Sequence, residues 1–267
     1  MNYIVIPDVH NRVGAAEAVA SKYPNHTKVF LGDYFDDYHD NPYIAKRTAD
    51  WLRWSVYQPD RIHLMGNHDL PYACPTIYSM CPGWSRDKHA AVGKVMLRAD
   101  WECLELVSII QLERPLVLSH AGFTLASIHS VQSACDVASD GRADHLRDLT
   151  PEENLDTIRE KANNCMQAIM GGWYHSWLAQ GRRMGRPEAA GPFWLDMRDH
   201  HPVNGIDQIV GHTLIDEPVK LCLPNATTST SDNWFIDTAS RHAVLIEDGK
   251  ITPICADTGG PFTTEHS

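Results

Sequence analysis

Positive charge is scarce in this chain of 267 residues. Its 23 lysines and arginines stand against 34 aspartates and glutamates, which gives a net charge of −11 at pH 7. Non-specific binding to nucleic acid or to an anionic membrane surface depends on clustered basic side chains. The shortage of positive charge therefore argues against both kinds of partner.

Long apolar runs are also missing. No stretch approaches the roughly 20 apolar residues that a membrane-spanning helix needs, and the opening MNYIVIP lacks the basic segment that begins a signal peptide. Apolar residues make up 43% of the chain and charged residues 21%, which is ordinary for a globular protein. We expect a cytoplasmic protein that has no membrane partner.

Paired cysteines are missing as well. The seven cysteines are scattered and contain no C-x-x-C motif; they are Cys74, Cys81, Cys103, Cys135, Cys165, Cys222 and Cys255. This spacing predicts neither a disulfide framework nor a closed zinc site with cysteine ligands. We expect reduced thiols, most of them packed as small hydrophobic side chains.

The first quarter of the chain alternates short apolar runs with segments of helical composition. Strands are predicted at 3–6, 27–31 and 61–65, separated by helices at 13–22 and 42–57. This order predicts right-handed βαβ units and a largely parallel inner sheet.

The middle of the chain is predicted to be more irregular. Prolines and glycines predict a loop at 71–84, followed by a helix at 87–101 and by strands at 104–111 and 115–119. From about 123 to 205 the pattern is polar and helical, and Pro151 is expected to begin one of its helices. We interpret residues 123–205 as a helical insertion or cap near the functional site.

Short strands return in the last part of the chain. They are predicted at 207–210, 219–221, 233–237, 243–247 and 250–255. Asp248-Gly249, between the last two, is a strong hairpin signal. No internal repeat and no low-complexity linker divides the chain. We therefore expect a single domain over residues 1–267 that carries the helical insertion.

Metal-binding types of side chain follow the ends of predicted strands. The segments are Asp8-Val9-His10, Gly32-Asp33-Tyr34-Phe35-Asp36, Gly66-Asn67-His68-Asp69, His120-Ala121-Gly122 and Gly211-His212-Thr213. Open α/β sheets place their ligands at the carboxyl ends of strands. Carboxylates, imidazoles and an amide oxygen form a mixed set that suits divalent Mn, Fe, Zn or Co.

Such a set favours phosphate ester hydrolysis. The negatively charged oxygens of a phosphate ester repel an attacking nucleophile. Two metals about 3.5–4 Å apart can screen that charge, lower the pKa of a water towards about 7, and hold the entering and leaving oxygens. An imidazole that is not bound to metal can then protonate the leaving oxygen.

The order of these motifs, D-x-H, G-D-x-x-D, G-N-H-D, H-x-G and G-H-T, resembles the calcineurin-like metallophosphoesterase superfamily over residues 8–213. The segment GDYFD at 32–36 is similar to the branch that contains phosphoprotein phosphatases and symmetrical diadenosine tetraphosphate hydrolases. The resemblance implies a four-layer α/β/β/α sandwich of two mixed sheets flanked by helices, with the helical insertion added.

The resemblance also implies a role for each motif residue. The six metal ligands would be Asp8 and His10 on the first metal, Asp33 as the bridge, and Asn67, His120 and His212 on the second. His68 would be the general acid, oriented by Asp36. The cofactors would be two divalent metal ions, with Mn expected and Fe or Zn as alternatives.

The sequence departs from the family pattern in two places. Much of the superfamily ends the last motif with a second histidine, where this chain has Leu214, as in the phosphoprotein phosphatase branch. That branch usually follows G-D-x-x-D with Arg-Gly, whose arginine binds the substrate phosphate, where this chain has Asp37-Tyr38. Arg12 and Arg198 are the candidates to replace that arginine.

A further basic cluster is interpreted as a solvated loop, with binding of a polyphosphate or phosphopeptide as the alternative; it comprises Arg182, Arg183 and Arg186.

The predicted function is hydrolysis of phosphomonoesters, like that of a serine/threonine protein phosphatase, by attack of a hydroxide bound to the two metals. The substrate would be a phosphoprotein or a nucleotide. The nearest alternative is a dinucleoside polyphosphate or nucleotide hydrolase. A phosphodiesterase is disfavoured by the acidic balance and the missing second histidine, and a non-catalytic scaffold is disfavoured because every expected ligand and the His68–Asp36 pair are retained.

Overall fold

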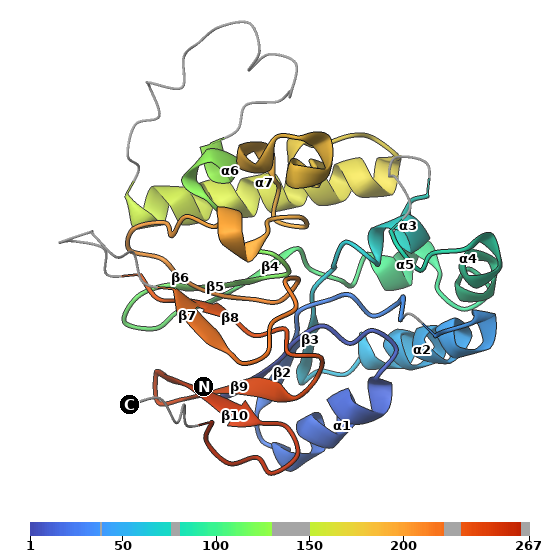
Figure 1. Cartoon of the computed structure of the whole chain (residues 1–267), viewed down its shortest axis with the longest axis horizontal. Coiled ribbons are helices and arrows are strands. Elements are labelled where there is room, and N and C mark those ends of the chain that lie inside the picture. The colour runs from blue at the N-terminus through green and yellow to red at the C-terminus, as the bar shows by residue number, and fades with distance from the viewer. Residues whose placement is uncertain (38, 76–80, 130–149, 222–230, 263–267) are drawn as a thin grey trace, which may run out of the picture.

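Two five-stranded sheets form the centre of the protein, and helices lie on their outer faces (Figure 1). The computed structural model describes residues 1–37, 39–75, 81–129, 150–221 and 231–262. The predicted arrangement of two mixed sheets flanked by helices is confirmed.

The first sheet has the strand order β10-β9-β1-β2-β3. Its strands are β1 (Tyr3–Ile6), β2 (Thr27–Phe30), β3 (Arg61–His63), β9 (His242–Glu247) and β10 (Lys250–Cys255). Strands β1, β2 and β3 are parallel, as the βαβ pattern predicted, while β9 is antiparallel to both β1 and β10. The hairpin between β9 and β10 turns through Asp248 and Gly249, whose φ angles of 49° and 77° fit an Asp-Gly turn.

The second sheet has the strand order β4-β5-β6-β8-β7. Its strands are β4 (Val107–Ile110), β5 (Leu116–Ser119), β6 (Asp207–Val210), β7 (Val219–Leu221) and β8 (Asn233–Phe235). Strands β5, β6 and β8 are parallel, and the two edge strands run antiparallel to them.

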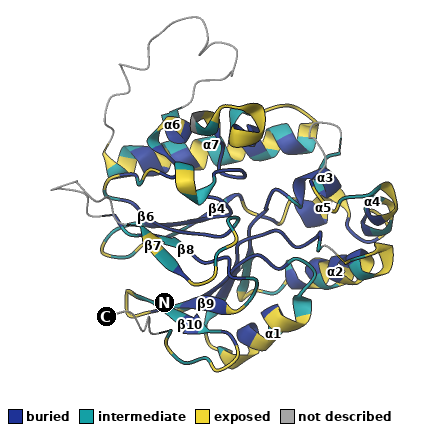
Figure 2. Ribbon diagram, in the orientation of Figure 1, coloured by how far each residue is buried: buried dark blue, intermediate teal, exposed yellow. Residues whose placement is uncertain are grey.

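Strand β1 is apolar throughout because both of its faces are buried. Val5 packs between the two sheets, in a cluster with residues such as Leu118 and Ile209 of the second sheet. Its neighbours Ile4 and Ile6 point the other way, into the cluster that the helices cover. Burial along the strands is visible in Figure 2. The β1 position in the sandwich therefore places the loop after Ile6 in the middle of the molecule.

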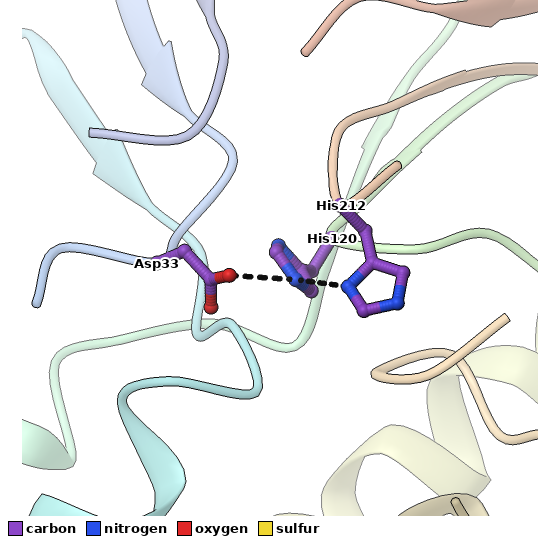
Figure 3. A group of neighbouring side chains, drawn as sticks. All are labelled: Asp33, His120 and His212. Carbon is purple, nitrogen blue, oxygen red and sulfur yellow. Dashed lines mark hydrogen bonds and ion pairs between the residues drawn. The ribbon is translucent and has the colours of Figure 1, made fainter. Parts of the chain in front are cut away.

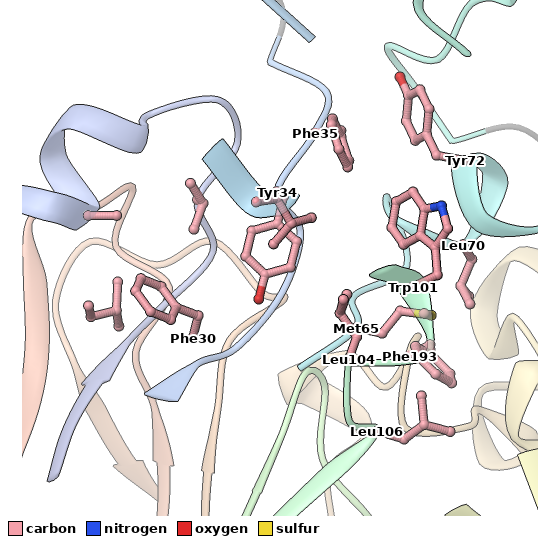
Figure 4. Packing of buried hydrophobic residues seen from close by; sticks show 14 of the residues in the cluster. Phe30, Tyr34, Phe35, Met65, Leu70, Tyr72, Trp101, Leu104, Leu106 and Phe193 are labelled. Carbon is pink, nitrogen blue, oxygen red and sulfur yellow. The ribbon is translucent and has the colours of Figure 1, made fainter. Parts of the chain in front are cut away.

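The helices of the first half pack around the first sheet and its loops. They are α1 (Val13–Lys22), α2 (Pro42–Ser55), α3 (Leu70–Ala73), α4 (Arg86–Val92) and α5 (Arg98–Trp101). The side chain of Asn41 caps α2 by accepting hydrogen bonds from the N–H groups of Tyr43 and Ile44. Apolar side chains under the loops after β2 and β3, among them Phe35, Tyr72 and Trp101, pack together (Figure 4).

The described parts of the region 123–205 lie over the outer face of the second sheet (Figure 1). It contains α6 (Leu125–His129), α7 (Pro151–Gly171) and four 3₁₀ turns at Ser176–Leu178, Gly181–Met184, Pro187–Ala189 and Met197–Asp199, while residues 130–149 lie outside the described ranges. Helix α7 begins with a capping box between Thr150 and Glu153 and ends at Gly172, whose φ is 77°. Its predicted start at Pro151 is confirmed.

Two predictions about local structure are wrong. The helix expected at 87–101 is two short helices, because the turn around Gly93 and the extended backbone of Leu97 interrupt it. The loop expected at 71–84 begins as helix α3, and its residues 76–80 lie outside the described ranges. The five described cysteines form no disulfide, as expected, and within the described ranges no helix has both the length and the apolar character for a membrane crossing.

Candidate metal centre

The carboxyl ends of five parallel strands, three from the first sheet and two from the second, lead to one place between the sheets. From the first sheet, Asp8 and His10 follow β1, Asp33 follows β2 and Asn67 follows β3. From the second sheet, His120 follows β5 and His212 follows β6. The structure therefore brings all six predicted metal ligands together, and their binding of metal stays a prediction.

The loops that carry these side chains adopt an unusual backbone conformation. The φ angles are 41° at His10, 48° at Asp33, 65° at Asp36 and 64° at His212. A non-glycine residue in the left-handed region costs on the order of 1–3 kcal/mol, and such residues concentrate at functional sites. Four of them around one centre indicate that the loops are shaped for the site.

Asp8, His10 and Asp33 form the first ligand group. Their potential ligand atoms all lie within 4.8 Å of one another. His10 Nε2 is 3.7 Å from Asp33 Oδ2 and 4.0 Å from Asp8 Oδ2. This spacing allows one cation to contact all three side chains.

Asp33, His120 and His212 form the second group, shown in Figure 3, and their ligand atoms also lie within 4.8 Å. His120 Nε2 is 3.4 Å from Asp33 Oδ2 and 3.2 Å from His212 Nδ1. The Oδ1 atom of Asn67 lies 2.8 Å from His120 Nε2 and 2.9 Å from His212 Nδ1. Asp33 Oδ2 thus lies next to both groups, which is where a bridging carboxylate would stand.

Hydrogen bonds that two of the imidazoles donate to backbone carbonyl groups set the orientation of these rings. His10 Nδ1 lies 2.9 Å from the carbonyl oxygens of Phe35 and Asp36, and His120 Nδ1 lies 3.0 Å from that of Leu31. A carbonyl oxygen only accepts, so Nδ1 carries the proton in both rings. The Nε2 lone pairs are then free to bind a metal, which is the usual arrangement around a histidine ligand.

The electrostatics of the centre fit a divalent cation. Burial lowers the pKa of His10 to about 4 and that of His212 to about 3, so both rings are neutral at pH 7. Burial, together with the charges of Asp237 and Asp33, raises the pKa of Asp8, and burial with the charge of Asp69 raises that of Asp33. Buried carboxylates that repel one another lack a positive counter-charge, and a metal ion supplies one.

His68 and Asp36 form a pair beside the ligand groups. His68 Nδ1 is 3.1 Å from Asp36 Oδ2, and the His68 ring meets the His10 ring edge-on with centroids 5.2 Å apart. The backbone N–H of His68 donates to Asp33 Oδ1 over 2.8 Å. Burial raises the pKa of Asp36, but hydrogen bonds, first of all from His68, outweigh burial and hold that pKa below its usual value.

Two motif glycines are required because the acidic side chains pass very close to them. A Cβ atom at Gly66 would stand 2.2 Å from Asp33 Oδ1, and one at Gly211 would stand 2.0 Å from Asp8 Oδ1. Any side chain at these positions would displace a predicted metal ligand.

The sequence model of the family described as "Calcineurin-like phosphoesterase" matches residues 1–216, which is most of the chain. The protein belongs to the calcineurin-like phosphoesterase family. Members of this family use a dimetal centre, and the two ligand groups around Asp33 are the candidate ligands for it here.

Two solved structures are similar to this calcineurin-like phosphoesterase. A metallophosphoesterase from Sphaerobacter thermophilus is 13% identical with a TM-score of 0.41, and the match covers 92% of this chain and 83% of that one. The NAD nucleotidase NadN of Haemophilus influenzae is 12% identical with a TM-score of 0.38, and the match covers 96% of this chain and 50% of that one. A comparison with curated proteins finds no match.

The two predicted phosphate-binding arginines of this calcineurin-like phosphoesterase differ in placement. The Nη1 atom of Arg12 is buried and has no hydrogen-bond partner among the described residues, and its Nε lies 4.0 Å from Asp37. The side chain of Arg198 is 79% exposed and lies 3.9 Å from Asp196. Arg12 lies close enough to His10 of the first ligand group for its charge to help lower the pKa of that ring, while the side chain of Arg198 is mostly exposed.

Sequence reasoning did not foresee the contacts of two further cations. Arg183, assigned to a solvated loop, lies 4.4 Å above the ring of Trp194, which in turn meets the ring of His212 at 6.1 Å. Lys88 is buried and hydrogen-bonds to Asp36 over 2.8 Å. Neither residue belongs to a family motif, and the basic cluster that contains Arg183 does not reveal its contact, because these contacts depend on how distant segments pack.

Proposed function

We propose that this calcineurin-like phosphoesterase hydrolyses phosphomonoesters in the manner of a serine/threonine protein phosphatase. The observation that carries the proposal is the position of Asp33 Oδ2, which lies 3.7 Å from His10 Nε2 and 3.4 Å from His120 Nε2. One carboxylate is therefore shared by two ligand groups, with the His68–Asp36 pair beside them.

The residues that would hold the two cations are Asp8, His10, Asp33, Asn67, His120 and His212. Their mixed nitrogen and oxygen donors suit Mn²⁺, with Fe and Zn as the alternatives. When bound, the two cations would screen the phosphate charge and acidify a water molecule.

His68 would supply the proton that the leaving oxygen needs. Its Nδ1 is engaged by Asp36 Oδ2, which leaves Nε2 to donate. Asp36 is held ionised by its hydrogen bonds, and an ionised carboxylate stabilises a protonated imidazole. The pair therefore has the parts of a general acid and the group that orients it.

Arg12, rather than Arg198, is our candidate for binding the substrate phosphate. A buried guanidinium nitrogen without a partner among the described residues has lost its hydrogen bonds to water, which costs free energy. A phosphate oxygen of the substrate would accept a hydrogen bond from it. The exposed Arg198 has no such reason to lie where it does.

The monoester preference rests on the last motif. Leu214, which is 66% exposed, stands where a second histidine would complete the first ligand group in other members of the superfamily. The phosphoprotein phosphatase branch shares that replacement, so we place this chain there and expect a phosphoprotein or a nucleotide as its substrate.

The test compares p-nitrophenyl phosphate with bis-p-nitrophenyl phosphate, after chelation and after Mn²⁺ addition, with bound metal measured by mass spectrometry. Release that depends on Mn²⁺ and favours the monoester supports the proposal. Preference for the diester assigns a phosphodiesterase instead, and metal binding without hydrolysis of either compound refutes phosphoesterase activity. Diadenosine tetraphosphate is included, and its faster cleavage favours the dinucleoside polyphosphate alternative.

A further inference from the structure

Lys88 is a buried cation outside every motif of the family. Its side chain is 3% exposed, and it stands in the first turn of α4, where the Ser85 side chain caps the helix by accepting from the Lys88 N–H. Burying an ammonium group is costly unless its charge and its three N–H donors are all matched. Its partners therefore explain why it lies there.

The ammonium group of Lys88 binds two aspartates. It donates to Asp36 Oδ1 over 2.8 Å, and it lies 2.7 Å from Asp40 Oδ1 and 2.9 Å from Asp40 Oδ2. Asp40 also accepts from the Nδ2 of Asn11, the residue after His10, over 2.8 Å. Lys88 thus joins the loop after β2 to the loop after β1.

The two oxygens of Asp36 have separate tasks. Oδ1 accepts from Lys88 and, over 2.6 Å, from the hydroxyl of Tyr72, while Oδ2 is 3.1 Å from His68 Nδ1. A carboxylate fixed at one oxygen by two donors cannot rotate freely about its Cβ–Cγ bond. Gly83 packs against its other side, since a Cβ there would lie 3.1 Å from Asp36 Cβ.

We infer that Lys88 is a positioning residue for the general acid: by anchoring Asp36 Oδ1 it holds Oδ2 where it orients the His68 imidazole towards the leaving oxygen. The inference rests on the proposed function. Lys88 itself would touch neither metal nor substrate. Its loss should therefore impair protonation of the leaving group and spare both metal binding and substrate binding.

The experiment uses two phosphomonoesters that differ in their need for an acid. 4-Nitrophenolate leaves without a proton much more readily than phenolate does, so only phenyl phosphate depends strongly on His68. In Lys88→Met, kcat for phenyl phosphate should fall about 10- to 100-fold, part of the roughly 10²–10⁴ that a general acid supplies, and kcat for p-nitrophenyl phosphate should fall less than about 3-fold. KM and metal content should be unchanged.

Lys28→Met is the matched control. Lys28 is also buried and also pairs with an aspartate, Asp60, over 2.7 Å, but it lies near the start of β2, away from the centre. Its replacement should destabilise the fold without changing the ratio of the two kcat values. His68→Ala gives the largest expected fall in kcat for phenyl phosphate relative to kcat for p-nitrophenyl phosphate.

A second measurement needs neither metal nor activity. The Nδ1 proton of His68, hydrogen-bonded to Asp36, should give a downfield proton resonance in chelated protein, assigned by its loss in His68→Ala. The resonance should disappear or move upfield in Lys88→Met and persist in Lys28→Met. If Lys88→Met does not fold, Lys88→Gln, which keeps a donor, replaces it and should show a smaller selective loss.

The outcomes separate the two proposals. A folded wild type that hydrolyses neither ester refutes the proposed function. An active wild type whose Lys88 variant slows equally on both esters, loses activity in proportion to lost metal, or keeps the His68 resonance unchanged refutes the role of Lys88 alone.

Discussion

Adding one methyl group at Gly66 should weaken metal binding at the candidate centre. A Cβ there would stand 2.2 Å from Asp33 Oδ1 and 2.4 Å from the Asp33 backbone nitrogen, whereas ordinary contacts begin at 3.4 Å. Asp33 or the Gly66 backbone must therefore move by about 3.4 − 2.2 = 1.2 Å. A shift of about 1 Å in a catalytic group costs on the order of 10²-fold in rate. Because Asp33 is the proposed shared ligand, binding of both metals should be affected.

The assay for Gly66→Ala combines metal content by mass spectrometry, Mn²⁺-dependent p-nitrophenyl phosphate hydrolysis and urea unfolding. We expect fewer than two metals per chain, a loss of activity of about 10²-fold or more, and destabilisation of about 1–3 kcal/mol from the overpacking. Gly14→Ala is the control, because a Cβ at Gly14 in α1 meets nothing within 4 Å. A Gly66→Ala protein that keeps both metals and full activity would show that the close approach is not what requires glycine here.

Three further predictions follow from the same geometry. His68→Ala should keep both metals yet lower kcat for phenyl phosphate by about 10²–10⁴-fold; loss of metal in step with activity would contradict the acid assignment. Arg12→Ala should raise KM for phosphomonoesters with metal content unchanged, and steady-state kinetics with an unaltered KM would remove it from the substrate site. Burial lowers the pKa of His63 to about 3, so as pH falls below about 6.5 the unfolded chain takes up a proton that the folded chain excludes, and stability decreases. Urea unfolding between pH 7 and pH 4 should show a weaker decrease in His63→Gln, and an equal decrease would assign the acid sensitivity to other groups.

Most of the framework around the site was predictable from local pattern. Each strand that leads to the centre contains or is followed by apolar residues that are buried, and a site residue stands two positions after the last of them. The residues Asp33 and His212 have a left-handed backbone conformation, and each directly follows a glycine in a motif that is visible in the sequence. The family resemblance then added an order to those motifs that composition alone does not give.

What escaped prediction depends on contacts between distant segments. Arg183 and Lys88 make their contacts through the packing of distant segments, and neither the basic cluster that contains Arg183 nor the isolated Lys88 shows these contacts in the sequence. The helix expected at 87–101 failed for the opposite reason, since a local break around Gly93 outweighed helical composition on both sides. The side chain of Arg198 is exposed, and its role in binding phosphate stays a prediction.

The proposed metal ligands come from both halves of the sandwich. Asp8 and Asn67 follow strands of one sheet, while His120 and His212 follow strands of the other. A bound metal pair would therefore link two sheets that otherwise meet mainly through apolar side chains. Metal binding across the two sheets would stabilise the folded sandwich, and this stabilisation would increase with metal concentration. With metal bound, the two sheets would then unfold together. With the metal removed, amide hydrogen exchange would become faster in one sheet than in the other. The candidate metal centre would in this way also join the two sheets, and the supply of metal would help to determine how long the folded chain persists.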